Sequence, residues 1–285
     1  MSENTSEVTA KKKDNKLKTV VSALLCAVII IALDYPIGYF MKSIGIDPKM
    51  STRVCLTLLS VAAFIILGGK KWLRFDAKGF GRSWLICLPI MLYEAYQVVP
   101  AVIWRIEDGI PPGVCGRLCY ILILYILVGI FEEFLFRGLV FGGLLRALGK
   151  KKHGLVTAAV IASLIFGYAH VYSSIDYTNI YSVMTALLKT VQTGLYGFIL
   201  CYSCVRNKQI WGAVAVHIFS DFMLRLPNAL VTLESHASYV NTDRESALIA
   251  LDDYSTTILF YLIPWVIAFI KLRKVEPTEA PFGDD

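Results

Sequence analysis

The sequence predicts an all-α fold: a polytopic membrane bundle of about eight transmembrane helices. Hydrophobic residues make up 56% of the 285 residues, and the mean hydropathy is +0.60. The apolar residues form long runs and lack the amphipathic spacing of helices in soluble proteins. Lysine and arginine lie at the ends of alternate runs, as the positive-inside rule predicts for membrane proteins. The chain is therefore expected to be an integral membrane protein.

The first apolar run, residues 20–41, is expected to be a retained span. No small-x-small cleavage site follows it, so it does not resemble a signal peptide. The predicted spans cover approximately residues 20–41, 52–69, 83–104, 117–141, 155–172, 180–205, 210–226 and 254–272.

One domain accounts for the whole pattern, because no connection between spans is long enough for a soluble domain. We predict a disordered basic cytoplasmic tail at 1–18 and a single transmembrane domain at 19–274. The candidate motifs fall in a core at 117–225, and residues 275–285 are expected to form a polar cytoplasmic tail.

Charge alternation predicts the orientation of the chain. The basic connections follow the second, fourth, sixth and eighth predicted spans, so both termini are expected to be cytoplasmic. The net charge of +6 comes from these clusters and not from a basic stripe, so a nucleic-acid partner is not expected. The short loops and the lack of a soluble domain favour a bacterial plasma-membrane protein whose surroundings are the lipid bilayer.

Residues 131–138, FEEFLFRG in one-letter code, place three charges inside the apolar run 118–140. Each costs roughly 2.5–3.5 kcal/mol at the membrane centre, and such residues usually mark a functional site. Residues four apart share a helix face, so Glu133 and Arg137 can pair. Glu132 is turned by about 100° from Glu133 and can face a cavity.

Further polar residues fall at similar depth in other spans. His170 ends one span, while His217 and Asp221 share a face of another. At 1.5 Å per residue, Glu132, His170 and His217 lie roughly 13–24 Å from the inner ends of their spans, within the middle layer of a hydrocarbon core about 30 Å thick. We interpret these residues as one site. The remaining charges at depth, which we interpret as snorkelling, capping or structural pairs, are Asp34, Glu94, Lys189 and Arg225.

A carboxylate and a neutral imidazole can share one water, which the carboxylate deprotonates as the water attacks a carbonyl. A second histidine can then stabilise the oxyanion. This chemistry is peptide-bond hydrolysis inside the membrane. The alternative is a zinc site made of Glu132, His170 and His217, but no H-E-x-x-H pair exists, and using all three as ligands leaves none of them as the base. We expect no metal or other cofactor, with zinc as the alternative.

Three ordered motifs carry a resemblance to a known family: Glu132-Glu133-x-x-x-Arg137, Phe166-x-x-x-His170 and His217-x-x-x-Asp221. Over residues 117–225 the chain resembles the CPBP family. That family comprises the type II CAAX prenyl endopeptidases together with Abi and lysostaphin-resistance-A-like proteins involved in bacteriocin processing or immunity. The resemblance implies an eight-span intramembrane glutamic protease.

The resemblance also implies roles for the motif residues. Glu132 would be the base, with His170 activating water, and Glu133 with Arg137 would form a supporting pair. His217 and residue 221 would form the oxyanion site. The prenyl endopeptidases usually have asparagine where this chain has Asp221, and an ionised aspartate only accepts hydrogen bonds. Asp221 is either protonated or orients His217 from its far nitrogen, and we favour orientation.

The expected substrate is a hydrophobic or membrane-anchored peptide or protein, such as a peptide pheromone, a bacteriocin precursor or a membrane protein, since prenylated substrates are not expected in a bacterium. One alternative is an immunity or membrane-regulatory binding protein with the same fold and no turnover, which the complete set of acid–base residues disfavours. Another is a transporter that uses the carboxylates as a proton relay, which the absence of internal repeats disfavours.

Overall fold

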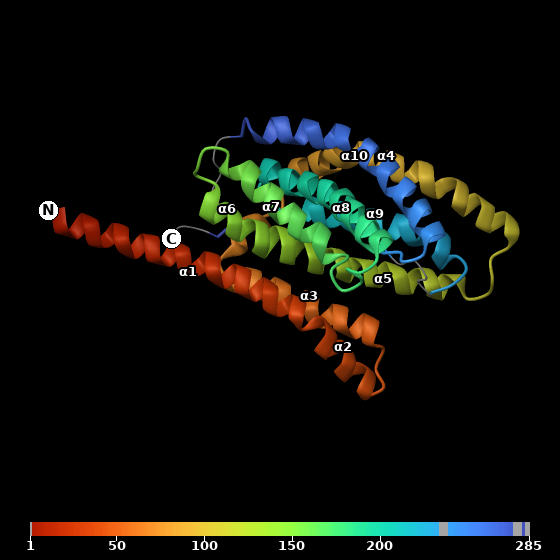
Figure 1. The fold of residues 1–285 in the computed structure, drawn as a ribbon. Helices are drawn as coiled ribbons and strands as arrows, with labels where there is room; N and C mark the ends of the chain where they lie inside the picture. The colour runs from red at the N-terminus through yellow and green to blue at the C-terminus, as the bar shows by residue number, and fades with distance from the viewer. Residues whose placement is uncertain (1, 234–238, 276–280, 283–285) are drawn as a thin grey trace.

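The computed structural model describes residues 2–233, 239–275, 281 and 282, and side chains from Leu17 onward. All the regular structure in these residues is helical (Figure 1). The elements, in chain order, are α1 (Ser2–Ala32), α2 (Asp34–Ser43), α3 (Pro48–Ile66), the 3₁₀ turn η1 (Gly69–Leu73), α4 (Ala77–Asp108), α5 (Val114–Glu132), the π-helical segment η2 (Glu133–Phe141), α6 (Gly142–Leu148), α7 (Gly154–Ala169), α8 (Ile180–Asn207), α9 (Trp211–Ala229) and α10 (Arg244–Leu272).

The prediction of a polytopic helical bundle is confirmed. Among the described residues, six helical runs are long and apolar enough to cross a membrane, fewer than the eight spans expected. The two remaining predicted spans coincide with α7 and α9. α7 is only 16 residues long. α9 has the length of a span but carries His217, Asp221 and Arg225, which lower its hydropathy.

Two chain ends differ from the sequence expectation. α1 begins at Ser2 and so includes the segment predicted to be a disordered tail. No proline or glycine interrupts this part of the sequence, and an existing apolar helix extends without a new nucleation cost. At the other end, Phe282 is buried in what we expected to be a polar tail. Its ring packs against Phe64, and its carbonyl accepts a hydrogen bond from Nη1 of Arg146.

Small residues bring α7 and α8 close together and thereby position the end of α7. A Cβ atom added to Gly167 would lie 2.1 Å from the backbone oxygen of Thr190. On α8, Gly194 faces the backbone of Ser163 in the same way. Close backbone approach through glycine is a common way of packing membrane helices. His170, the residue directly after α7, is held in place by this contact.

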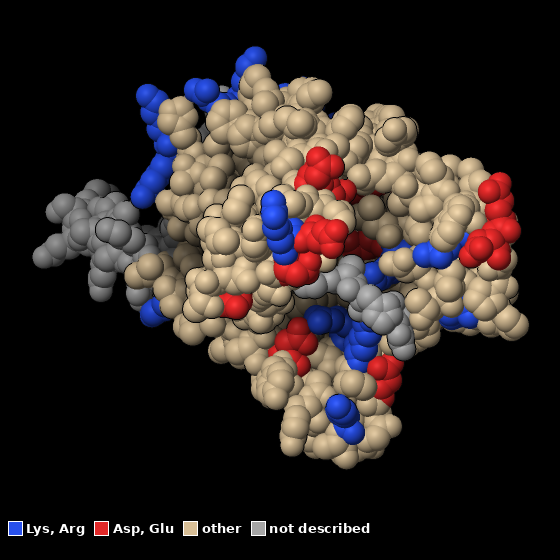
Figure 2. Space-filling view, turned by 45° about the vertical axis from the view of Figure 1, so that its right-hand side comes forward, with Lys and Arg blue, Asp and Glu red and all other residues tan. Residues whose placement is uncertain are grey.

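The arrangement of the helices leads several chain segments to one place inside the bundle. α9 packs against both α4 and α5, and α8 packs against α7 and α10 (Figure 1). The segment η2 contacts α3, α5, α6 and α7. Most of the face seen in Figure 2 is uncharged, as expected for a surface that meets lipid, and charged side chains gather around a hollow in it.

Candidate active site

The two adjacent glutamates lie where the long helix changes its winding. Glu132 is the last residue of α5, and Glu133 is the first residue of η2. All nine residues of η2 are buried. Short π-helical segments inside α-helices are rare and frequently occur at functional sites. The change of winding therefore marks the same stretch that the sequence singles out by its charges.

Glu133 and Arg137 form the ion pair that their spacing predicts. Nη1 of Arg137 lies 3.0 Å from Oε1 of Glu133, and both side chains are at most 1% exposed. The guanidinium also stacks on Phe166, with Cζ 4.0 Å from the ring centroid. The arginine is thus held between a carboxylate from η2 and an aromatic ring from α7. A buried pair of this kind fixes both partners, because separating them would leave an uncompensated charge inside the protein.

His217 connects this pair to the second carboxylate. Its Nδ1 lies 2.7 Å from Oε1 of Glu133, and its Nε2 lies 3.7 Å from Oε2 of Glu132. The carboxylate of Glu133 is paired with Arg137 and acts as an acceptor, so we assign the hydrogen to Nδ1 of His217. Nε2 is then the nitrogen available to a substrate or to water.

His170 faces the same carboxylate oxygen from the other side. Its Nδ1 lies 2.8 Å from the carbonyl oxygen of Phe166, one turn earlier. A carbonyl can only accept, so Nδ1 carries the hydrogen, and in the neutral ring Nε2 keeps its lone pair. That Nε2 lies 3.7 Å from Oε2 of Glu132. The side chain of Glu132 is 17% exposed as a whole, but Oε2 itself is buried and has no hydrogen-bond partner.

Asp221 does not hold the far nitrogen of His217, as the sequence analysis preferred. Its Oδ2 lies 3.7 Å from Nε2, whereas Glu133 occupies Nδ1. The preference was wrong because His217 and Asp221 are one turn apart on the same helix. That spacing brings the carboxylate to the nitrogen facing Glu132 and leaves the opposite nitrogen to η2.

A cavity of about 100 Å³ lies against this cluster. The residues that line it are Glu94, Phe166, His170, Lys189, Gln192, Thr193, Tyr196, His217, Ser220, Asp221, Leu224, Tyr239 and Tyr261. Three of the six predicted site residues line the cavity: His170, His217 and Asp221. Glu132 and Glu133 lie against His217, and Arg137 lies behind them beside Phe166.

Two charged residues of this cavity were interpreted from the sequence as structural, and their part in the site was missed. Glu94 accepts hydrogen bonds from Ser220 (2.6 Å) and from Tyr261 (3.0 Å). Lys189 donates to Gln192 (3.0 Å) and lies over the ring of Tyr239. The only sequence signal was a charge inside an apolar run. Neither residue has a motif neighbour at helical spacing that would have linked it to the site.

Tyr239 comes from the connection between α9 and α10 and closes one side of the cavity. Burial raises the pKa of this phenol to about 12, so the hydroxyl keeps its proton at neutral pH. The ring stands 6.4 Å from that of His170, measured between centroids. An aromatic wall beside the imidazole suits an apolar substrate segment better than a charged one.

The described residues contain no group of three or more His, Cys, Asp or Glu side chains arranged to hold a metal ion. The sequence-based expectation that the site works without a metal stays a prediction. Chemically, the arrangement offers one carboxylate between two imidazole nitrogens. A second carboxylate, held by an arginine, fixes one of the two rings.

Fold and site together define an integral membrane protein with a buried carboxylate–imidazole centre. Residues 115–223 match the family described as type II CAAX prenyl endopeptidase Rce1-like. The match confirms the resemblance to the CPBP and CAAX protease family, and the matched segment contains Glu132, Glu133, Arg137, His170, His217 and Asp221. At the level of the family, the chemistry is that of a protease. No curated protein and no solved structure matches the chain.

Proposed function

We propose that the protein is an intramembrane endopeptidase that hydrolyses a peptide bond in a hydrophobic or membrane-anchored peptide. The observation that carries the proposal is the position of Glu132. Its Oε2 lies 3.7 Å from Nε2 of His170 and 3.7 Å from Nε2 of His217. A water placed between Glu132 and His170 would contact a carboxylate oxygen and an imidazole lone pair at once, which suits general-base activation.

In the proposed reaction, the oxygen of this water attacks the carbonyl carbon of the scissile peptide. One proton of the water passes to Glu132 as the new C–O bond forms, and His170 holds the water in position. Collapse of the tetrahedral intermediate breaks the C–N bond. The proton held by Glu132 passes to the leaving nitrogen, so the products are a carboxyl group and an amine.

His217 is proposed to stabilise the oxyanion of the intermediate. Glu133 fixes the ring through Nδ1, so the proton on Nε2 of the imidazolium points into the site. The negative groups Glu132 and Asp221 lie near this nitrogen and favour the positively charged ring. A hydrogen-bond donor fixed before the reaction stabilises charge that develops in the transition state without further reorganisation.

The location and substrate belong to the same proposal. Apolar helices support an integral membrane protein, the charge alternation supports cytoplasmic termini, and the short loops favour a bacterial plasma membrane. The cavity walls include Phe166, Leu224 and Tyr239, which suit apolar side chains. Peptide pheromones, bacteriocin precursors and other membrane proteins fit this requirement, and a prenyl group on the substrate is not needed.

The test compares membrane peptides from cells that express the wild type, Glu132→Gln or Glu107→Gln. Glu107 is an exposed carboxylate near the end of α4 and serves as the matched control. We expect specific peptide products with the wild type and the control, and their loss with Glu132→Gln. The same products from all three strains would contradict catalysis by Glu132. An absence of products from all three, with purified wild type also inactive on membrane peptides, would favour a binding or immunity protein.

A further inference from the structure

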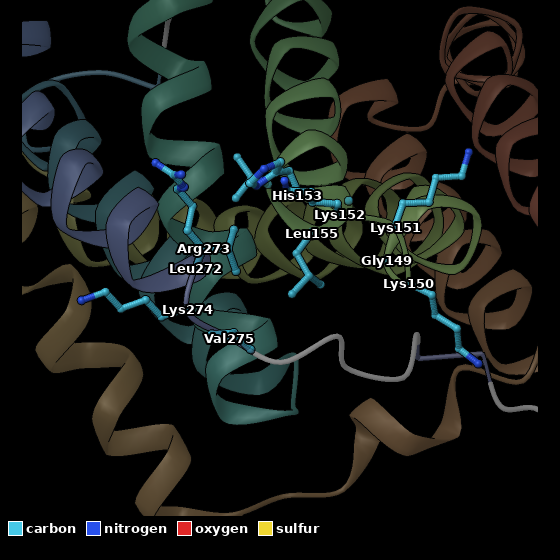
Figure 3. A pocket seen from close by; sticks show the side chains of 12 residues that line it. Gly149, Lys150, Lys151, Lys152, His153, Leu155, Leu272, Arg273, Lys274 and Val275 are labelled. Atoms are coloured by element: carbon cyan, nitrogen blue, oxygen red, sulfur yellow. The ribbon is translucent and has the colours of Figure 1, made fainter.

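A second and larger cavity lies at the end of α7 remote from His170. Its volume is about 450 Å³. Two chain segments form it: residues 149–156, which connect α6 to α7, and residues 272–275, which follow α10 (Figure 3). α7 separates the two cavities by roughly 24 Å, from 16 residues at 1.5 Å each. The second cavity is therefore not part of the proposed active site.

Among the described residues that line this cavity, the charged ones are all basic. Of the residues that line it, the basic ones are Lys150, Lys151, Lys152, Arg273 and Lys274, with His153 beside them, and none is acidic. These side chains are exposed. Figure 3 shows the two segments on opposite sides of the cavity, with the side chains of Lys150, Lys151 and Lys274 extending outward from its edge. A concave surface bordered by charges of one sign concentrates ions of the opposite sign.

The floor of the cavity is apolar. Leu155, Val156 and Leu272 are buried and line it, and Val275 is partly buried beside them. A ligand that fits this surface combines a charged group with a hydrocarbon part. A free inorganic anion would use the rim and leave the floor in contact with water.

The N-terminus of α7 adds a further feature that favours an anion. α7 begins at Gly154, and its N-cap residue His153 has a left-handed backbone (φ 63°) and makes no side-chain capping hydrogen bond. Gly154, Leu155 and Val156 line the cavity. The first amide groups of a helix lack partners within the helix and carry a partial positive charge. The amide of Gly154 donates to the carbonyl oxygen of Lys151 (2.8 Å), so the amides that follow it in the first turn are the ones this feature concerns.

We propose that this cavity binds the headgroup of an anionic phospholipid. The phosphate would contact the basic rim and the N-terminus of α7, and the beginning of an acyl chain would lie against the apolar floor. The cavity lies at an end of the helical bundle, where the turn between α6 and α7 and the C-terminal end of α10 meet (Figure 1). Basic pockets between membrane helices at the bilayer surface are suited to anionic headgroups.

The test uses the purified full chain and native mass spectrometry with three probes: phosphatidylglycerol, phosphatidylcholine and inorganic phosphate. The cavity variant is Lys151→Gln/Lys152→Gln/Arg273→Gln. The matched control is Lys70→Gln/Arg74→Gln/Lys78→Gln, which removes the same charge outside the cavity. The control lies at the same end of the bundle, because Trp72 of η1 packs on Phe141, the last residue of η2 before α6.

We expect phosphatidylglycerol to bind the wild type and the control with affinities within about twofold, and the cavity variant to bind at least about tenfold more weakly. Equal weakening in both variants would show diffuse surface attraction and overturn the proposal. Binding of phosphatidylcholine as tight as that of phosphatidylglycerol would overturn it as well, and so would full displacement of the lipid by millimolar phosphate. If the cavity variant unfolds at a lower temperature than the control, Arg273→Gln alone replaces it, and unchanged lipid binding in that variant counts against the proposal.

Discussion

His217 donates a hydrogen bond from Nδ1 to Oε1 of Glu133 over 2.7 Å, the same oxygen that lies 3.0 Å from Arg137. One carboxylate oxygen therefore anchors both a guanidinium and an imidazole. The anchoring leaves Nε2 of the ring turned to Glu132. Two adjacent glutamates thus have different surroundings, because Glu133 is fully buried and paired while Glu132 is 17% exposed.

Replacing each glutamate with glutamine in turn distinguishes the structural role of Glu133 from the proposed catalytic role of Glu132. Glu133→Gln leaves Arg137 without a compensating charge in the interior, and breaking such a buried pair costs about 3–5 kcal/mol. Glu132→Gln removes the proposed base at a partly exposed position and is expected to change stability much less. Thermal unfolding of the purified variants in detergent measures the first effect, and peptide cleavage measures the second. A greater loss of stability in Glu132→Gln than in Glu133→Gln would reverse the assigned roles.

Asp221→Asn is expected to be tolerated better than Asp221→Leu. Glu133 already fixes His217, so residue 221 is not needed to orient the ring. An asparagine side chain keeps a polar group near Nε2 and can itself donate a hydrogen bond. We expect activity within about tenfold of the wild type for asparagine, and a loss of about 10²–10³ for leucine, as for removal of an oxyanion-site group. An equal, severe loss in both variants would show that the carboxylate itself is required.

Much of this site could be predicted because its residues obey local rules. The ion pair of Glu133 and Arg137 follows from a spacing of four residues, and the nearness of His170 and His217 to Glu132 was expected from their similar positions along apolar runs. The partner of Nδ1 in His217 could not be predicted. It depends on how α9 packs against η2, and no rule of spacing within one helix describes that contact.

Contacts between different helices also explain which residues of the cavity were missed from the sequence. Glu94 and Lys189 join the cavity only because α4, α8 and α9 meet there. Nor does the sequence reveal the π-helical winding of η2, since the pairing of Glu133 with Arg137 is also compatible with an α-helix. The helical class and the approximate positions of the apolar helices follow from the order of apolar runs along the chain and were predictable, whereas six of the eight expected spans are long and apolar enough to cross a membrane in the described residues.

Gly167→Ala is expected to impair the site from a distance. The new methyl group would meet the backbone oxygen of Thr190, so α7 and α8 must move apart and His170 must move with α7. The matched control is Gly116→Ala in α5, where nothing lies within 4 Å of the added Cβ. The control should be neutral or stabilising by up to about 1 kcal/mol, because alanine favours helix over glycine. Cleavage rates and unfolding temperatures test the pair, and full activity of Gly167→Ala would contradict this account of how His170 is positioned.

The predicted orientation can be tested at the two ends of α4. Position 77 is the first residue of this helix and position 110 follows its end, and its 32 residues span roughly 48 Å at 1.5 Å each, enough to cross a membrane. We expect Ala77→Cys to be labelled from the cytoplasmic side and Ile110→Cys from the opposite side. The background must lack native cysteines, since Cys115 and Cys119 are exposed. Labelling of both positions from one side of intact cells would show that the topology is wrong.

Exhaustive chelation is expected to leave activity intact. The carboxylate of Glu133 is already engaged by Arg137 and His217, and the buried guanidinium disfavours a second cation beside it. Four candidate ligands then remain: Glu132, His170, His217 and Asp221. If zinc bound the two histidines and Glu132, that carboxylate would no longer be free to accept the proton of the attacking water.

A histidine that binds a metal through one ring nitrogen often donates a hydrogen bond from its other ring nitrogen to a carboxylate. His217 makes such a hydrogen bond to Glu133, so the metal-dependent alternative has to be tested by experiment. The measurement is elemental analysis of the purified protein, together with cleavage assays after dialysis against strong chelators. Glu132→Gln serves as the inactive control. We expect less than a stoichiometric amount of metal and unchanged cleavage. About one equivalent of zinc, with activity lost on its removal and restored on its return, would replace the carboxylate mechanism with a metal-dependent one.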